Sequence, residues 1–384
     1  FSLIFYSLTL NNILNIIVLL ILAGVTIATL MGNNGIITRA NEAKTETEKA
    51  EEDELRRLTE LEAVTHLKEY SYTDPKGKKV KIPAECAVSQ VEGENIVEDG
   101  LVIIDVNGNE WVWIEVPKSI YLTATSNTDY TNIEIDMQNY VKDYKVDGIE
   151  DIWRSEVQHG FVTSTDYENY KKNMLKSVYD NEGFFIALTA RTSGEDELTT
   201  PMIKQGAYPY NYITCRQAQD LSNKLSIGGK TSSLMFGIQW ELVLKFIESK
   251  GGKTKDEILE GDLADWGNFK NAEFEVHGGS YSMPQKDNSW IKIDSKYEKK
   301  NGETVLFTTG ISERNSVLNI YDFVGNSWEW ILASSIAESN SEHVIKAGIS
   351  YVSDSNEEGV NIKYMAANHY TDFSENDGFR PALY

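Results

Sequence analysis

Cysteine and histidine could give this chain nucleophilic or soft-metal chemistry, but their spacing favours neither. Cys86 and Cys215 are far apart and lack zinc-ligand spacing. They can form at most one disulfide bond, and two buried free thiols are an equally open alternative. The histidines occur singly, and a lone histidine is more often a surface or core residue than a ligand. They are His66, His159, His277, His343 and His369.

The charge balance excludes one class of partner. The chain has 384 residues with 36 Lys and Arg against 59 Asp and Glu, which gives a formal net charge of −23. Nucleic-acid binding is not expected, because phosphate neutralisation needs clustered Lys and Arg. The same acidity predicts repulsion from anionic lipid headgroups. A hydrophobic content of 41% is sufficient for at least one core.

The elements that must position any site begin with an uncharged segment. Residues 1–38 contain no charged side chain, and the first charged residue is Arg39. Residues 13–28 approach the ~20 apolar residues that a bilayer-spanning helix needs. From 36 to 67, charged helix formers carry apolar residues at helical spacing. We therefore expect one long helical stalk over residues 1–68, kinked or opened near 32–35.

A turn-forming linker over residues 69–82 separates this stalk from a globular domain over residues 83–384. Asn107 and Gly108 lie between two apolar runs and predict a β-hairpin within residues 100–114. Helical spacing predicts helices near 215–225 and 240–249. Residues 120–200 are polar, Tyr-rich and weakly periodic, as expected of an insertion. The fold class expected is α+β.

Residues 19–40 (LLILAGVTIATLMGNNGIITRA) resemble the N-terminal segments of type IV pilins and pseudopilins, the class III signal-peptide proteins. The resemblance implies removal of a short leader before Phe1 and N-methylation of Phe1. It also implies storage in the cytoplasmic membrane before assembly into an extracellular filament. The residues it places in the filament core are Phe1, Phe5, Asn11, Asn12, Asn15, Leu19 and Leu22.

The chain departs from that family at one position. Many members carry a glutamate that pairs with a neighbour's N-terminal amine, but Phe5 takes its place here. The amides of Asn11, Asn12 and Asn15 need partners if they are buried. Either they supply hydrogen bonds between subunits, or they mark a stretch that loosens on leaving the membrane. An ordinary single-pass anchor without a filament is the alternative interpretation.

A second resemblance lies near residue 325. Gly325-Asn326-Ser327-Trp328-Glu329-Trp330 is similar to the Gly-Asn-x-Trp-Glu-Trp signature of the formylglycine-generating-enzyme (sulfatase-modifying-factor) superfamily. Weaker matches at 212–221, 237–242 and 377–383 follow the family's order. The resemblance implies a C-type-lectin-like domain over residues 83–384, with 120–200 poorly matched. The complete expectation is an α+β chain with a long N-terminal helical stalk and an irregular C-type-lectin-like domain.

The same resemblance argues against enzyme activity. The family's oxidase binds copper through a pair of cysteines in its C-terminal region, and this chain has no cysteine after Cys215. Related sulfoxide synthases bind iron through a His/His/Glu cluster, but the histidines here are scattered. We therefore expect the family's fold without catalysis and without copper.

A calcium site and a ligand surface remain as expectations. In the family, residues of this signature bind Ca²⁺, and the resemblance assigns Asp322, Gly325, Ser327 and Glu329 to that role, with hard oxygen ligands that suit the ion. The alternative is that the two acids only cap turns. The candidate surface for a glycan or protein ligand is Tyr351, Tyr364, His369 and Tyr370, although aromatic residues near a core more often pack.

The function expected is that of a structural subunit of an extracellular type IV pilus-like filament. Its N-terminal segments would form the core of a helical homopolymer, and the lectin-like domain would lie outside, available for adhesion. The alternatives are a minor pseudopilin or tip adhesin, and a membrane-anchored ectodomain with residual metal-dependent enzyme activity.

Overall fold

The computed structural model describes residues 36–154, 161, 163–187, 190–191, 200–278, 280–284, 289–294, 296–335, 343–355, 366–369 and 374–384. The chain divides between Arg57 and Leu58 into two units, Phe1–Arg57 and Leu58–Tyr384. The second unit is called the head below.

The expected fold class was wrong. Small sheets dominate the described residues, and the helices are few. A long N-terminal helical stalk is not shown, since residues 1–35 lie outside the described part and the helix that follows ends at Ala63 rather than near Leu67. The six α-helices of the described residues are α2 (Ile36–Ala63), α3 (Tyr130–Tyr140), α5 (Ser164–Asn181), α6 (Cys215–Asn223), α7 (Gly237–Ser249) and α8 (Lys255–Leu259).

Local chemistry explains where α2 ends. The Thr65 hydroxyl donates a hydrogen bond to the Glu62 carbonyl oxygen at 2.7 Å, which satisfies one of the last carbonyls of the helix.

From Arg39 to Glu54, the side chains of α2 that the structure describes are exposed. None of the helices in the described part of the chain combines the length and apolar composition that a bilayer crossing requires.

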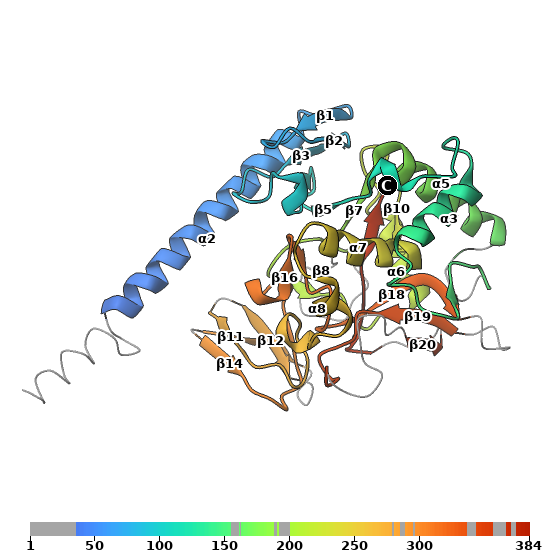
Figure 1. Ribbon diagram of the computed structural model, residues 1–384. Coiled ribbons are helices and arrows are strands. Elements are labelled where there is room, and N and C mark those ends of the chain that lie inside the picture. The colour runs from blue at the N-terminus through green and yellow to red at the C-terminus, as the bar shows by residue number, and fades with distance from the viewer. Residues whose placement is uncertain are drawn as a thin grey trace, which may run out of the picture. The chain divides into compact units, whose positions relative to one another are not determined.

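Two larger sheets organise the head (Figure 1). The first is antiparallel, in the order β10 (Ser232–Leu234), β22 (Pro381–Leu383), β7 (Gly183–Ile186), β5 (Glu110–Glu115), β4 (Val102–Asp105) and β3 (Cys86–Val88). The second has the order β20 (Ala366–His369), β19 (His343–Ala347), β18 (Trp328–Ser335) and β21 (Asp377–Phe379), with β6 (Ile149–Glu150) also on β18. Strands β18 and β21 run parallel.

The first sheet is buried on both faces. Along β5, Val112 and Ile114 belong to the main hydrophobic cluster, whereas Trp111 and Trp113 belong to a second cluster. Successive side chains of a strand point to opposite faces, so this alternation places a core on each side. Helix α7 lies against β5 and β18 and fills the main cluster with Trp240.

Smaller sheets account for the rest of the head. They are β1 (Tyr70–Thr73) with β2 (Lys79–Ile82), β11 (Phe274–His277) with β14 (Lys296–Lys299), β13 (Ile291–Lys292) with β12 (Tyr281–Pro284) and β15 (Val305–Phe307), β16 (Ser316–Val317) with β17 (Ile320–Tyr321), and β8 (Ala190–Arg191) with β9 (Tyr208–Pro209). Strands β11, β12 and β14, orange in Figure 1, lie far from α3 and α5 in the head.

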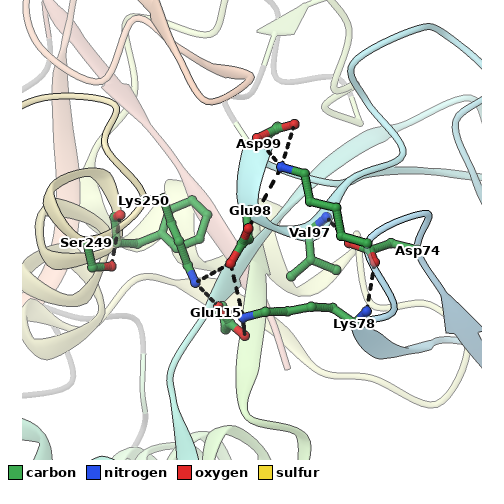
Figure 2. A network of polar contacts seen from close by, with 10 residues as sticks. Asp74, Lys78, Val97, Glu98, Asp99, Glu115, Ser249 and Lys250 are labelled. Atoms are coloured by element: carbon green, nitrogen blue, oxygen red, sulfur yellow. Dashed lines mark hydrogen bonds and ion pairs between the residues drawn. The ribbon is translucent and has the colours of Figure 1, made fainter.

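A network of charges holds the β1–β2 hairpin to the rest of the head (Figure 2). Lys78 lies 2.9 Å from Glu115 at the end of β5, and Lys250 after α7 pairs with the same carboxylate. Glu98 bridges both lysines at 3.5 and 3.9 Å. Burial raises the pKa of Glu115, but the hydrogen bonds from Lys250 and Lys78 more than offset it, so the net effect is a lowered pKa.

Candidate functional site

The turn that joins β17 to β18 contains Asp322, Gly325 and Ser327, and Glu329 follows as the second residue of β18. The turn needs left-handed backbone, with φ of 47° at Asp322, 74° at Gly325 and 62° at Asn326. A Cβ atom on Gly325 would lie 2.6 Å from the backbone nitrogen and oxygen of Asn268, so only glycine fits there. The turn is therefore fixed by its contact with the loop at Asn268.

Glu329 is paired with an arginine that the sequence did not connect to it. Arg380 donates from Nε to Oε2 at 2.9 Å and from Nη2 to Oε1 at 2.8 Å. The two side chains are 1% and 2% exposed. Burial raises the pKa of Glu329 despite the opposing attraction of Arg380. The result is a bidentate ion pair in the core.

Arg380 also binds the backbone of the turn. Its Nη2 donates to the Tyr321 carbonyl oxygen at 2.9 Å and to the Asp322 carbonyl oxygen at 3.3 Å. The guanidinium therefore contacts four oxygens, two from a carboxylate and two from the backbone. These are the oxygen types that a hard metal ion uses.

Asp322 is buried as well, but it has fewer partners. Its Oδ2 accepts a hydrogen bond from the Gly310 backbone N–H at 2.8 Å, and its Oδ1 has no hydrogen-bond partner among the described residues. Burial raises the pKa of Asp322 to about 6, against the opposing effects of the Gly310 hydrogen bond, of Arg380 and of the Asn315 side chain. Two buried carboxyl groups, one in the turn and one at the start of β18, thus lie near the single cation Arg380.

The other two expected calcium ligands, Gly325 and Ser327, already form hydrogen bonds within the protein. The Gly325 carbonyl oxygen accepts from the Ser327 backbone N–H at 2.7 Å, and the Ser327 hydroxyl donates to backbone oxygens of Trp328 and Asn376, both at 3.1 Å. Calcium takes about six to eight oxygens. With both Glu329 oxygens bound by Arg380, the residues in this arrangement do not fit the ion. Within the described ranges, no group of three or more His, Cys, Asp or Glu side chains gathers as a metal site.

A second buried cation, Lys299 at the end of β14, reaches the loop at residues 268–272. The Lys299 ammonium donates to the carbonyl oxygens of Phe269 at 2.6 Å, Lys270 at 3.2 Å and Ala272 at 2.9 Å. The side chain belongs to a residue that is 1% exposed. Burial lowers the pKa of Lys299 to about 8. The three N–H donors of the ammonium thus meet three backbone acceptors.

Two asparagines join the loop at residues 268–272 to the turn. Asn268 donates from Nδ2 to the Asn326 Oδ1 at 3.0 Å, and Asn326 in turn accepts from the Phe307 backbone N–H at 3.2 Å. Both side chains are buried. The two cation sites therefore flank one hydrogen-bonded junction between loops. No sequence pattern indicated a role for Lys299, whereas Arg380 lies within the weaker family match at 377–383 but had no role assigned to it.

The four residues expected to form a ligand surface are not brought together by the described structure. Tyr351 is buried in a small cluster with Met283 and Leu306. Tyr364 and Tyr370 lie outside the described residues, and His369 is described only as backbone in β20. The expected adhesive surface is thus untested, except that Tyr351 lies in the core.

A different aromatic cluster adjoins that small core through Trp290. The ring centroid of Tyr208 is 5.1 Å from that of Tyr281 and 4.9 Å from that of Trp290, at interplanar angles of 52° and 68°. All three residues are half-buried. We call Tyr208, Tyr281 and Trp290 the aromatic corner. Sequence analysis missed it because the three residues come from separate segments with no shared motif.

The residues expected in the filament core cannot be placed. Phe1, Phe5, Asn11, Asn12, Asn15, Leu19 and Leu22 all lie outside the described residues. The head begins with exposed apolar side chains: Leu58, Leu61, Val64 and Leu67.

Both cysteines are free thiols in buried positions. Cys86 lies in β3 and packs in the second hydrophobic cluster, and Cys215 begins α6 in the main cluster. Burial raises the pKa of each thiol. Neither is an activated nucleophile, since reactive thiols require the opposite shift.

Comparisons with known proteins give limited similarity. No protein-family model matches the chain, and no curated protein matches it. The solved structures with some similarity include PvdO from Pseudomonas aeruginosa, at 15% identity and a TM-score of 0.33, covering 53% of this chain and 81% of that one. CarF has 12% identity and a TM-score of 0.29, covering 46% and 71%. Treponema denticola variable protein 1 has 11% identity and a TM-score of 0.24, covering 82% and 98%. With TM-scores this low, none of the three carries an argument about this chain.

Proposed function

We propose that this chain is a structural subunit of an extracellular filament. The single observation that carries the proposal is the change at Arg39: residues 1–38 carry no charged side chain, whereas helix α2 is rich in charged side chains from Arg39 onward. An apolar segment of that length must be covered by lipid or by other apolar segments. Copies of the same segment supply the second environment in a homopolymer, and the membrane supplies the first before assembly.

The head suits display on the outside of such a filament. It has hydrophobic cores on both faces of its first sheet, so it needs no partner to complete them. The chain's net charge of −23 keeps neighbouring filaments apart by repulsion. No cysteine follows Cys215, which leaves no basis for the copper-dependent oxidation known in the resembling family. We therefore propose a structural role without catalysis.

Electron microscopy of filaments sheared from producing cells, with peptide mass spectrometry of the same fraction, tests this proposal. The expected result is a uniform filament made mainly of this chain, with a methylated Phe1. Leu19→Arg should abolish filaments, because it introduces a charge into the apolar segment. The matched control is Leu122→Arg, at a head residue that is 86% exposed, and it should leave them intact. A chain found only in membranes would show that the segment is an anchor.

One observation favours adhesion as a second function. Half-buried aromatic rings that meet at an angle, as in the aromatic corner, offer flat apolar faces beside hydroxyl groups. This combination suits a neutral sugar, and the acidity of the chain disfavours anionic glycans. Adhesion would be compatible with a major subunit or with a minor tip subunit.

Binding to an array of neutral and sialylated glycans tests this second function. Trp290→Ala should weaken binding to a neutral glycan by about tenfold or more, since it removes one ring of the corner. Tyr130→Ala, which changes a half-buried aromatic residue in α3, is the matched control. Binding that survives Trp290→Ala unchanged would place any ligand site elsewhere.

A further inference from the structure

Two positively charged side chains, Arg380 and Lys299, lie beside the hydrogen bond that joins Asn268 to Asn326, which we call the loop junction. Each is surrounded by oxygen atoms of the kind that bind metal ions. Arg380 contacts the two Glu329 oxygens and two backbone oxygens. Lys299 contacts three backbone oxygens of the loop at residues 268–272. Oxygen atoms that converge in a buried position repel one another unless a cation lies between them.

The surroundings of Lys299 are unusual for a lysine. Its ammonium hydrogen-bonds only carbonyl oxygens among the described residues. The carboxylates of Glu303, Asp354 and Glu273 act on it by electrostatic attraction. Buried lysines are normally paired with a carboxylate, because desolvation of an ammonium costs several kcal/mol in general. Lys299 hydrogen-bonds three carbonyl oxygens of one short loop, so its charge stabilises the conformation of that loop.

Arg380 has the corresponding role for the turn. It neutralises Glu329 and also binds the carbonyl oxygens of Tyr321 and Asp322, so a single side chain connects both ends of the turn. The register of β18 and β21 brings it there, because Trp330 lies opposite Phe379 and Glu329 opposite Gly378. The position of this cation is therefore set by strand pairing and does not depend on a diffusible ion.

We propose that Arg380 and Lys299 are built-in cations that take the place of bound metal ions in the loop junction of the head. It follows that the head folds independently of calcium. It also follows that removing the Arg380 side chain creates a site for a divalent cation, lined by Glu329, Asp322 and the freed carbonyl oxygens.

The experiment is thermal unfolding of the full chain in non-ionic detergent, with EDTA or with about 5 mM CaCl₂, a concentration that saturates weak extracellular calcium sites. The melting temperature of the wild type should be the same in both conditions. Arg380→Ala should melt about 10 °C lower in EDTA, because it leaves a buried carboxylate unpaired. Calcium should restore at least half of that loss.

Two control variants make the result specific. Arg380→Lys retains a cation and should remain indifferent to calcium. The double variant Arg380→Ala with Glu329→Gln lacks the main carboxylate ligand and should show no recovery. Terbium luminescence provides a direct readout of binding, since Trp240 stacks on Phe323 at 4.1 Å and Arg380 lies 5.5 Å from that ring. Only Arg380→Ala should give a sensitised signal.

The proposal is overturned if EDTA lowers the melting temperature of the wild type, or if the wild type binds calcium with one-to-one stoichiometry. It is also overturned if Arg380→Ala folds but ignores calcium, or if it fails to fold even when calcium is present. Lys299→Ala provides a second comparison. It should also lower the melting temperature, because three buried carbonyl oxygens lose their hydrogen-bond donor. Calcium should not restore that loss, because three carbonyl oxygens are too few to hold the ion.

Discussion

Replacing Asp322 by asparagine is expected to stabilise the head at neutral pH. Asp322 is 2% exposed. The Arg380 guanidinium forms its bidentate ion pair with Glu329, so it neutralises the charge of Asp322 only weakly. Asparagine can still accept the hydrogen bond from Gly310 through its carbonyl oxygen. Its amide would lie near the Asn315 side chain, which interacts with the Asp322 carboxyl group. Because neither Nδ2 nor Oδ1 of Asn315 has another hydrogen-bond partner among the described residues, that amide can rotate to accept from the new asparagine. The substitution therefore removes a buried charge without a clear loss of hydrogen bonds.

The raised pKa of Asp322 determines how much the substitution stabilises the head and how that gain in stability changes with pH. Burial raises the pKa of Asp322 from 3.8 to about 6. A raised carboxyl pKa means that the folded protein binds a proton more tightly than the unfolded chain. Ionisation therefore destabilises the fold progressively as the pH rises from about 4, and the full cost is reached above pH 6. About two pKa units correspond to about 3 kcal/mol at pH 7. This advantage of the variant should shrink to about half at pH 5 and to about a fifth at pH 4.

Urea unfolding of the full chain in non-ionic detergent, followed by tryptophan fluorescence at pH 7, 5 and 4, measures this difference. Comparison of the variant with the wild type at each pH cancels the contributions of other groups, such as Asp151, whose pKa burial also raises to about 6. If Asp322→Asn destabilises the head at pH 7 and the difference does not change with pH, the buried charge is needed. That outcome would point to a cation at Asp322.

Three further predictions concern the rest of the head. Glu115→Gln should cost about 1 kcal/mol in urea unfolding at pH 7, a value reduced for partial exposure, and the difference should vanish as the pH falls through the lowered folded pKa of Glu115. Thr214→Ala removes the capping box of α6 and should cost about 1 kcal/mol in the same assay, with Thr45→Ala on exposed α2 as a near-neutral control. Cys86 and Cys215 should resist alkylation at pH 8 until the chain is unfolded, and rapid labelling of either in native protein would contradict their burial.

Some of the fold was predictable because its signals are local. The Asn107-Gly108 turn between two apolar runs predicted the pairing of β4 with β5, which is confirmed. Helical spacing predicted α6 and α7, and both are confirmed within a few residues. Helix α5 was missed because its inward face mixes Tyr167 and Lys171 with aliphatic residues. The Lys171 amine is satisfied by the Asp151 carbonyl oxygen and by Glu134, a long-range arrangement that no periodicity reveals.

The candidate site was predictable only in part, for a similar reason. The turn residues from Asp322 to Glu329 are contiguous, so a motif could identify them. Their partner Arg380 is brought to them by the parallel pairing of β18 with β21, and Lys299 reaches its loop from the end of β14. Contacts of this kind depend on tertiary register, which the sequence alone does not specify.

The placement of β21 and β22 has a consequence for how the head is made. These strands come last in sequence among those described, yet β22 lies between β10 and β7 in one sheet and β21 extends the other. Arg380 lies between them. While the ribosome is still synthesising residues before 377, the nascent head has a gap in one sheet, a missing strand in the other and an unneutralised Glu329. Completion of the head is therefore a late, non-local event, which predicts slow folding. A chain truncated before Asp377 would lack both strands and could complete neither sheet.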